Sequence, residues 1–371
     1  MKTALVYDWL VTMGGGEKTL SAIEELYPSP IHTLVHDPKQ LMGTPFENKE
    51  IHTSFLQKFP FAKSHYRNYL PFFPLAIEQF DLSGYDLVIS TSHAVSKGVL
   101  THCDQLHLCY CLTPMRYAWD LTHRYLEGVS GIRKKIAKAA LHYLRNWDIA
   151  TLKRVDHFAS ISHYIASRIK KVYGRDSEVI YPPVDVEAIP FCSAKENYYL
   201  AVSRMVPYKR IDLIVEAFAH LPDQRLVVIG DGPEMKKVKS LSKNNVEILG
   251  WQPDAKIREL MSKAKGFLFA AEEDFGIVVV EAQAAGTPII AFGKGAVLET
   301  VVPNKTGLFY PKQEVSSLIA AIQAFEKETF DPYEIRKSAE RFSKQRFMNE
   351  FKQFVTKKWE MFDEMRHSCR R

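Results

Sequence analysis

The chain has 371 residues, of which 46% are hydrophobic and 25% are charged, and its formal net charge is +6. This balance is typical of a soluble globular protein, and the length accommodates two domains of ordinary size. No block of like charges resembles a nucleic-acid-binding tail, and no apolar run reaches the ~20 residues needed to cross a bilayer. The mild positive charge suits a protein that meets anionic phosphates or an anionic membrane surface.

The cysteines and the first residues bear on the compartment. Five cysteines at irregular spacing give no disulfide framework. The chain opens with Met1-Lys2-Thr3 and enters a predicted strand at once, so we expect no signal peptide. These features predict a cytoplasmic protein, with peripheral attachment to the inner face of the cytoplasmic membrane as a further expectation.

Alternating strands and helices are predicted along the first half of the chain. Strands are expected over residues 4–9, 31–35, 87–90, 106–111 and 157–161. A glycine-rich turn leads into a helix over residues 15–27, and a longer helix is expected over residues 132–154.

The second half repeats this alternation. Strands are expected over residues 198–202, 225–229, 246–249, 266–270 and 288–292, with helices such as 211–220 and 254–263 between them. Repeated strand–helix units predict an α/β fold of parallel, doubly wound sheets, in which ligands bind beyond the carboxyl ends of the strands.

A domain boundary is predicted at Tyr181-Pro182-Pro183. The two prolines remove backbone donors and stiffen the chain, which ends one sheet without starting another. We therefore expect an N-terminal domain over residues 1–183 and a C-terminal domain over residues 184–349. Residues 331–365 are rich in charge and aromatics and contain no predicted strand.

The most informative stretch runs from Glu273 to Pro288. Two carboxylates, Glu273 and Glu281, lie eight residues apart between two apolar runs, which predicts strand, acidic loop, helix, Gly-Pro turn and strand. A helix that begins near Gly276 would present free backbone N–H groups and a positive dipole end to phosphate. The two carboxylates would be on the order of 10 Å apart, which suits hydroxyls on the two sugars flanking a diphosphate.

This arrangement, with Phe275-Gly276 inside it and Gly286-Thr287-Pro288 behind it, resembles the Glu-x7-Glu signature of the retaining glycosyltransferases of family 4. The resemblance implies the GT-B architecture, in which two Rossmann-like domains face a central cleft. It also implies a C-terminal helix over about 350–371 that crosses back to the N-terminal domain, with Trp359 and Phe362 as its docking face. An acidic loop before an ordinary helix is the alternative interpretation.

Two cations follow the first strand of the second half. Arg204 and Lys209 suit the two phosphates of a nucleoside diphosphate, because Arg offers a bidentate fork and Lys a compact charge. Family 4 members carry an Arg…Lys pair here, whereas a solvated basic loop is the other reading. Gly230-Asp231-Gly232 reads as a structural turn, and Trp251 either stacks on a nucleotide base or simply packs.

In the first half, Gly14-Gly15-Gly16-Glu17-Lys18-Thr19 almost matches a phosphate-binding P-loop. A P-loop needs glycine directly before the lysine, so Glu17 excludes an ATPase. In the family, this glycine turn faces the donor, so Gly15 and Gly16 are expected donor contacts; a bare tight turn is the alternative. His93 ends a predicted strand, where the resemblance places a histidine beside the reacting sugar.

The segment 109–120 indicates which subgroup of family 4 the chain resembles. Its Thr-Pro-Met-Arg116-Tyr117-Ala-Trp119-Asp120 resembles bacterial polysaccharide and O-antigen mannosyltransferases, although Leu112 stands where those relatives carry His. Arg116, Tyr117, Trp119 and Asp120 are therefore expected acceptor contacts, while Arg116 and Asp120, four apart, pair with each other in the alternative reading.

The helix predicted over residues 132–154 is basic and amphipathic. Such a helix lies at an anionic lipid surface, or it is a solvated helix with an ordinary buried stripe.

The resemblance implies transfer of a hexose, with mannose from GDP-mannose as the first choice, to a lipid-linked or oligosaccharide acceptor in bacterial surface polysaccharide synthesis. The sequence contains no Asp-x-Asp metal motif, so we expect no cofactor and no metal, with Arg204, Lys209 and the helix terminus stabilising the leaving group. His93, Glu273, Arg204 and Lys209 are the expected catalytic residues. The expected donor site comprises Gly15, Gly16, Arg204, Lys209, Trp251, Glu273, Phe275, Gly276, Ile277 and Glu281.

Two rival classes remain open. A nucleotide-sugar epimerase or hydrolase of the same shape is the first. An NAD-dependent oxidoreductase is the second, although the chain has no complete Gly-x-Gly-x-x-Gly.

Overall fold

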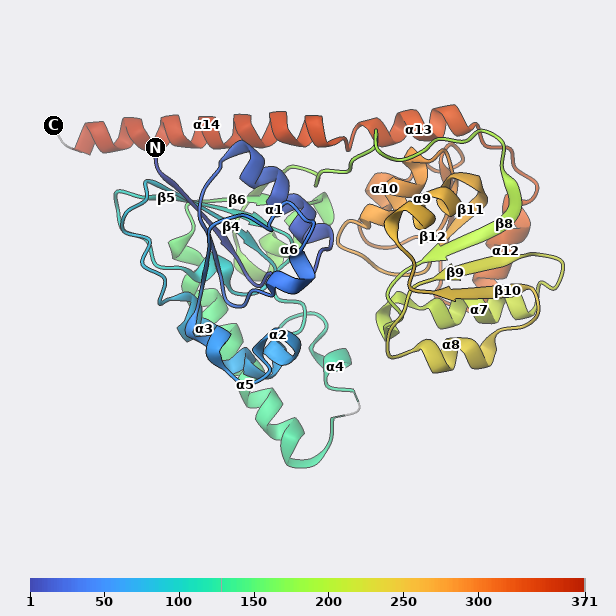
Figure 1. Ribbon diagram of the computed structural model, residues 1–371, viewed down its shortest axis with the longest axis horizontal. Helices are drawn as coiled ribbons and strands as arrows, with labels where there is room; N and C mark the ends of the chain where they lie inside the picture. The colour runs from blue at the N-terminus through green and yellow to red at the C-terminus, as the bar shows by residue number, and fades with distance from the viewer. Residues whose placement is uncertain (128, 370–371) are drawn as a thin grey trace. The chain divides into compact units, whose positions relative to one another are not determined.

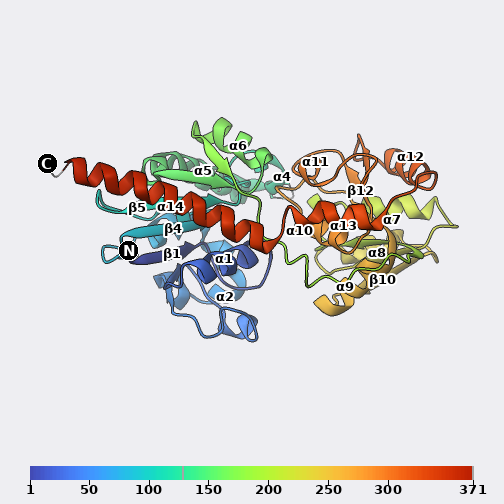
Figure 2. The ribbon, with the colours of Figure 1, turned by 90° about the horizontal axis from the view of Figure 1, so that it is seen from above.

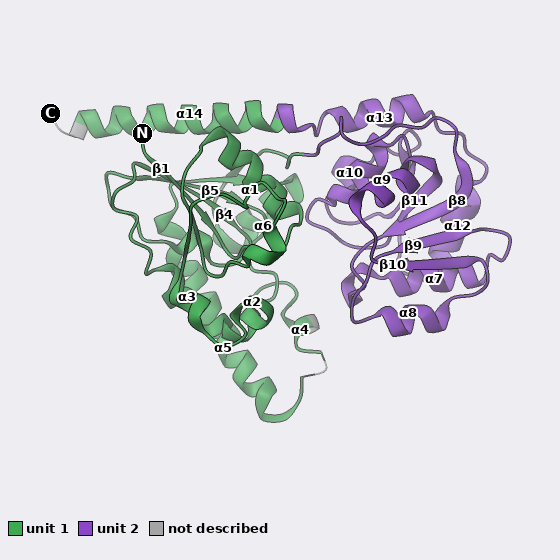
Figure 3. Ribbon diagram, in the orientation of Figure 1, with its two compact units in different colours: residues 1–183, 347–371 green, residues 184–346 purple. Residues whose placement is uncertain are grey.

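The computed structural model describes residues 1–127 and 129–369. The chain divides into two compact units, residues 1–183 with 347–371, and residues 184–346 (Figure 3).

The described part of the first unit holds a seven-stranded parallel sheet in the order β3-β2-β1-β4-β5-β6-β7. Its strands are β1 (Thr3–Tyr7), β2 (Ile31–Thr33), β3 (Ile51–Thr53), β4 (Leu87–Ser92), β5 (Leu106–Cys111), β6 (His157–Ser160) and β7 (Ser177–Val179). Every residue of β4 and β5 is buried, as expected for central strands of a parallel sheet that is covered on both faces.

Helices cover both faces of this sheet. The helices of the described part of the first unit are α1 (Gly15–Leu26), α2 (Ala62–His65), α3 (Phe73–Ile77), α4 (Thr122–Tyr125), α5 (Gly131–Ala150), α6 (His163–Tyr173) and the part of α14 (Lys344–Cys369) from Phe347 on. Figure 1 shows α14 on one side of the sheet and α3 and α5 on the other, and Figure 2 shows α14 running across the strands. A 3-10 turn, Thr151–Arg154, continues α5, so the helix predicted over residues 132–154 is confirmed.

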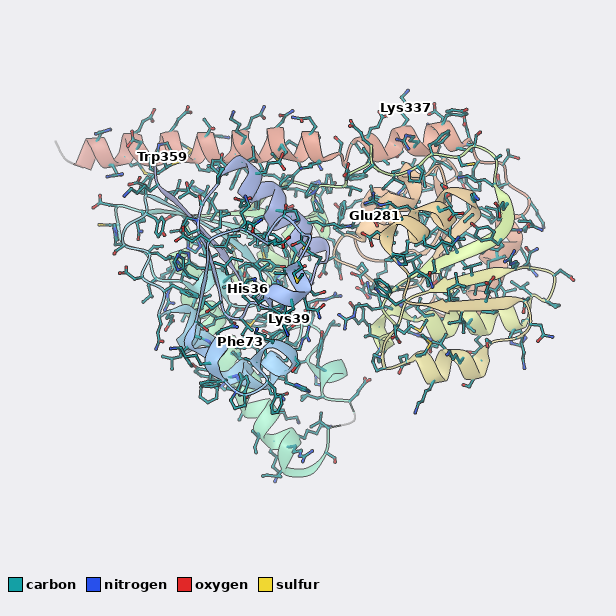
Figure 4. The ribbon with its side chains drawn as sticks, in the orientation of Figure 1. His36, Lys39, Phe73, Glu281, Lys337 and Trp359 are labelled. Atoms are coloured by element: carbon teal, nitrogen blue, oxygen red, sulfur yellow. The ribbon has the colours of Figure 1, made fainter. Side chains whose placement is uncertain are left out.

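The final helix packs its aromatic face on the first unit. Phe347 and Phe351 are fully buried, and both rings contact Tyr110 of β5. Trp359, labelled in Figure 4, is only half-buried, as is Phe362. The docking face therefore begins earlier in the helix than Trp359 and Phe362, because Phe347 and Phe351 reach the centre of the sheet.

The second unit holds a six-stranded parallel sheet in the order β10-β9-β8-β11-β12-β13, all within described residues. Its strands are β8 (Glu196–Val202), β9 (Leu226–Ile229), β10 (Val246–Gly250), β11 (Ala264–Phe269), β12 (Ile289–Phe292) and β13 (Gly307–Tyr310). Its helices are α7 (Ile211–Ala219), α8 (Met235–Leu241), α9 (Asp254–Lys263), α10 (Ile277–Ala284), α11 (Val297–Thr300), α12 (Val315–Phe325) and α13 (Pro332–Glu340). One core cluster joins α7 and α12 to one face of the sheet.

Each sheet reverses its strand order at one place. In the first unit this switch point lies between β1 and β4, and in the second it lies between β8 and β11. Loops that leave the carboxyl ends of two strands at a switch point diverge to opposite sides and leave a crevice where ligands of α/β proteins bind. The two switch points are therefore the candidate ligand-binding sites of the fold.

Candidate functional site

The loops after β8 and β11 bring together two side chains that are far apart in the sequence. β8 pairs with β11 in parallel, so both loops leave the same edge of the sheet. Lys209 lies in the first loop and Glu273 in the second, and the Lys209 ammonium forms an ion pair with the Glu273 carboxylate. Both side chains are less than one-fifth exposed, so this pair is partly shielded from water.

Arg204 lies in the same loop as Lys209 and is exposed. The described residues place no carboxylate within ion-pair distance of its guanidinium. An anion at this edge would therefore meet one exposed guanidinium and one ammonium that is already oriented by Glu273.

The helix α10 begins where the sequence predicts it. Gly276 is its N-cap with φ of +80°, a left-handed conformation that favours glycine, and Ile277 is its first residue. Phe275 is buried and its ring contacts Phe342, which anchors the loop just before the helix. The first backbone N–H groups of α10 have no partner within the helix, which makes this terminus suited to phosphate.

Glu281 lies one turn into α10, and Figure 4 labels it there. Its side chain is half-buried. From Ile277 to Glu281 the helix rises about 6 Å, so Glu281 is set back from the terminus as the spacing predicted.

The loop after β12 holds the acidic loop in place. Gly295 forms an isolated parallel bridge with Glu273, and Ala296 donates its N–H to the Glu273 carbonyl at 3.0 Å. A Cβ on Gly295 would lie 2.6 Å from that carbonyl oxygen, and its φ is +83°. Lys294 adds an ion pair with Glu272 at 3.1 Å. Gly295 is thus required as a glycine to position Glu273.

The turn Gly230-Asp231-Gly232 supports the loop that carries Arg204. A Cβ on Gly230 would lie 1.8 Å from the Ser203 carbonyl oxygen, and one on Gly232 would lie 2.5 Å from the Met205 carbonyl oxygen. Both glycines have positive φ. The turn is structural, as the sequence predicts.

We expect Gly230→Ala to lower the free energy of unfolding by about 2 kcal/mol or more, because the new Cβ meets backbone and the φ of +137° disfavours L side chains. Urea unfolding measures this loss. Gly84→Ala is the matched control, because no atom lies within 4 Å of its added Cβ, and it should change stability by less than about 0.5 kcal/mol. Equal stabilities for the two variants would contradict the role given to Gly230.

Trp251 does not pack. It follows β10, the edge strand of the sheet, and its side chain is 74% exposed. The packing alternative is therefore wrong, and the indole is accessible to a ligand.

The switch point of the first unit centres on Asp8 and His93. Asp8 is fully buried after β1, and its carboxylate accepts the backbone N–H groups of residues 93, 94, 95 and 96 at 2.6–3.0 Å. The His93 Nδ1 lies 3.1 Å from the same carboxylate, and Trp9 packs edge-on against the ring with centroids 4.4 Å apart. Asp8 therefore fixes both the loop and the imidazole, while the His93 side chain stays 23% exposed.

The glycine turn after β1 is closely packed. A Cβ on Gly16 would lie 2.5 Å from the Tyr7 hydroxyl and 3.0 Å from Cδ1 of Leu112. Burial raises the pKa of the Glu17 carboxyl, which lies beside Tyr7. Leu112 thus packs an apolar group against Gly16 at the position where the mannosyltransferases that the segment resembles carry His.

The second unit matches a known protein family. Residues 188–346, nearly the whole second unit, match the family model described as "Glycosyl transferases group 1". The second unit is therefore similar to the group 1 glycosyl transferases. The match contains Arg204, Lys209, Glu273 and Glu281, so the resemblance to family 4 is confirmed.

The curated relatives that this chain matches are distant. The chain is 29% identical over 168 residues to an uncharacterized glycosyltransferase of Methanocaldococcus jannaschii, covering 44% of this chain and 47% of that protein. It is 25% identical over 233 residues to the GDP-mannose-dependent alpha-(1-6)-phosphatidylinositol monomannoside mannosyltransferase of Mycolicibacterium smegmatis, covering 54% of this chain and 58% of that protein. The chain thus spans about half the length of these curated relatives.

Solved structures match this chain over nearly its whole length. Anabaena Alr3699/HepE in complex with UDP matches with a TM-score of 0.71 at 17% identity, covering 96% of this chain and 100% of that one. The sucrose-phosphate synthase of Thermosynechococcus elongatus matches with a TM-score of 0.70 at 17% identity, covering 97% and 100%. At these identities the likeness establishes the fold, which is the expected GT-B fold of two Rossmann-like units.

The segment 112–120 is held by partners that the sequence did not reveal. The Trp119 indole N–H donates to Asp148 of α5 at 2.7 Å, and Asp148 is fully buried against Lys97. Asp120 pairs with Arg168 of α6 rather than with Arg116.

The rest of the segment is placed by Arg168 and by aromatic packing. Arg168 also donates to the Thr113 hydroxyl at 2.9 Å, and Tyr117 packs its ring on Tyr125 with centroids 6.1 Å apart. The pairing of Arg116 with Asp120 is therefore wrong, and Trp119 and Asp120 position the segment.

The described residues contain no group of three or more His, Cys, Asp or Glu side chains placed to hold a metal ion. None of their helices combines the length and the apolar character that a membrane span requires.

Proposed function

We propose that this chain is a retaining, metal-independent glycosyltransferase that moves a hexose from a nucleotide-sugar to an acceptor. The observation that carries the proposal is the Lys209–Glu273 ion pair at the β8/β11 switch point, beside the N-terminus of α10. This arrangement offers cations and backbone N–H groups to a diphosphate and a carboxylate to sugar hydroxyls.

The leaving group is stabilised by charges that are already in place. The Lys209 ammonium, held beside Glu273, is a compact positive charge that donates N–H bonds to phosphate oxygens of the bound donor. Arg204 binds a second phosphate with its bidentate fork, and the α10 terminus adds N–H donors. Preorganised donors of this kind replace the metal that other transferases hold with an Asp-x-Asp pair.

The carboxylates and the histidine orient the donor. Glu273 binds hydroxyls of the transferred sugar, Glu281 binds the ribose, and His93 binds the hydroxyl nearest the reacting carbon. The acceptor oxygen forms its new bond on the face that the diphosphate leaves, and a departing phosphate oxygen takes the acceptor proton. The configuration at the sugar carbon is thereby retained.

GDP-mannose is the proposed donor, and a lipid-linked or oligosaccharide intermediate of bacterial surface polysaccharide synthesis is the proposed acceptor. Several relatives are GDP-mannose-dependent mannosyltransferases, which supports this choice. Arg116 and Tyr117 are the proposed acceptor contacts. We further propose that the protein works in the cytoplasm, peripheral at the inner face of the membrane.

Nucleotide binding tests the donor. In thermal-shift measurements with GDP, UDP and ADP, we expect GDP to raise the melting temperature most, because a ligand at a hundred times its Kd adds ~2.7 kcal/mol of stability. A larger shift with UDP would contradict the choice of GDP-mannose. Radiolabelled donor incubated with and without acceptor then separates transfer from hydrolysis or epimerisation, since only transfer requires the acceptor.

A further inference from the structure

We infer that the exposed face of the N-terminal half of α5 binds an anionic lipid bilayer. We call this surface the α5 outer face and define it by Ile132, Ile136, Ala139 and Tyr143. The inference deepens the proposed membrane association, but it does not depend on sugar transfer.

α5 carries two apolar stripes, and the core accounts for only one of them. Leu141 and Leu144 are buried in the core of the first unit, together with the half-buried Ala137. Ile132 and Ile136 are exposed by 68% and 63%, respectively.

The second stripe is continuous along the helix. At about 100° per residue, Ile132, Ile136 and Tyr143 lie within about 40° of one another, and they point roughly opposite to Leu141 and Leu144. Tyr143 is itself 47% exposed. The stripe is therefore not part of the fold's own core, and a solvated helix with one ordinary buried stripe does not describe α5.

Arg133 and Lys135 flank the stripe, one on each side, at about 100° per residue, whereas Lys138 and Lys134 lie further round the helix. Arg133, Lys134, Lys135 and Lys138 are all exposed. The stretch 131–147 contains no acidic residue, and Asp148, the first one, is buried against Lys97. Each Lys or Arg near an anionic leaflet contributes about 1 kcal/mol of attraction, and long basic side chains reach the headgroups while the apolar stripe enters the acyl boundary.

The position of the helix in the first unit leaves this face open. Figures 1 and 3 show the N-terminal turns of α5 projecting beyond the sheet and its other helices. A second copy of the chain is disfavoured as the occupant, because the flanking cations of two such faces would repel. A protein partner is also disfavoured, because lysine is depleted in protein–protein interfaces. Among the three, an anionic bilayer matches both the apolar stripe and its cations.

The test uses the full chain and vesicles, without donor or acceptor. Co-sedimentation is measured with vesicles of phosphatidylcholine alone and with vesicles that also contain phosphatidylglycerol. We expect binding to the anionic vesicles that weakens as salt is added. The double variant Ile132→Glu with Ile136→Glu should bind them about 100-fold more weakly.

A double variant of equal charge is the control. Ile149→Glu with Leu100→Glu changes exposed apolar residues outside the α5 outer face, which are 42% and 49% exposed, and should bind within about threefold of the unchanged chain. Equal losses in both double variants, or no binding of the unchanged chain to anionic vesicles, would overturn the inference. The unchanged chain could instead fail to bind vesicles and form a dimer that the double variant Ile132→Glu with Ile136→Glu does not form. That result would assign the α5 outer face to a second copy of the chain.

The same variants separate this inference from the proposed function. Nucleotide-induced thermal shifts should be identical in both double variants and in the unchanged chain, because the changes lie outside the proposed donor site. A chain that binds anionic vesicles through the α5 outer face but is not stabilised by any nucleotide would refute the proposed function alone.

Discussion

Replacing Lys209 with alanine is expected to lower the turnover of sugar transfer by about 10²–10³-fold, the loss typical of removing one preorganised donor from a developing anion. The reason lies in where the charge appears during the reaction. As the bond to the sugar breaks, negative charge grows on the diphosphate. In the proposed site this charge is stabilised by Lys209, Arg204 and the N-terminus of α10.

Glu273→Ala should remove nearly all transfer for two reasons. The carboxylate no longer binds the sugar, and Lys209 loses the ion pair that orients it. Steady-state kinetics with labelled donor measure both variants, and circular dichroism checks that they are folded. Transfer at the unchanged rate by either variant would remove that residue from the mechanism.

Lys294→Ala is the matched control for Lys209→Ala. It also removes a lysine paired with a glutamate of the acidic loop, Glu272, but its side chain is 59% exposed. We expect its turnover to stay within about threefold of the unchanged chain, because exposed ion pairs contribute little. An equal loss in both lysine variants would indicate a general effect of charge on the loop.

Asp148→Ala is expected to destabilise the first unit by about 3–5 kcal/mol, because it leaves the Lys97 ammonium buried without its partner. The Asp148 and Lys97 side chains are 0% and 1% exposed. Asp148 also accepts bonds from the Trp119 indole at 2.7 Å and the Tyr173 hydroxyl at 3.0 Å. One substitution therefore removes the shared acceptor of a buried network.

Urea unfolding followed by tryptophan fluorescence measures this loss. The double variant Lys97→Met with Asp148→Leu should recover part of the stability, since it removes the unpaired ammonium but leaves the Trp119 indole and the Tyr173 hydroxyl without their acceptor. Asp176→Ala, which breaks the exposed Lys170–Asp176 pair, should cost less than about 1 kcal/mol. An Asp148→Ala chain as stable as Asp176→Ala would contradict the network.

Long, apolar elements could be predicted from the sequence with good accuracy. The strand over Leu106–Cys111 and the helix over Asp254–Lys263 match their predicted bounds. The strands that the sequence did not reveal are β3, β7 and β13, which have only three or four residues and lie at the sheet edges. Such strands bury few side chains, so they leave little hydrophobic pattern to detect.

The site could be predicted as residue types, but not as contacts. Arg204, Lys209, Glu273 and Gly276 were all found from local motifs. The contact between Lys209 and Glu273 depends on the pairing of β8 with β11. No local sequence pattern specifies the order of strands in a sheet.

Partners that act over long sequence distances were missed for the same reason. The sequence shows that Asp8 is an acidic residue at the end of a buried strand. Its role, however, depends on the loop that starts at His93, 85 residues away in the chain. Asp148 and Arg168, which hold the segment 112–120, sit on helices whose local sequences show only an amphipathic pattern.

Calorimetric titration of GDP in the presence of EDTA tests most directly whether a diphosphate docks on the second unit without a divalent ion. We predict that the unchanged chain binds GDP under these conditions. Arg204→Ala should raise the Kd for GDP by about 10–100-fold, because a charge-assisted bond to phosphate is lost. Loss of GDP binding on addition of EDTA, or an unchanged Kd in Arg204→Ala, would contradict a metal-free diphosphate site.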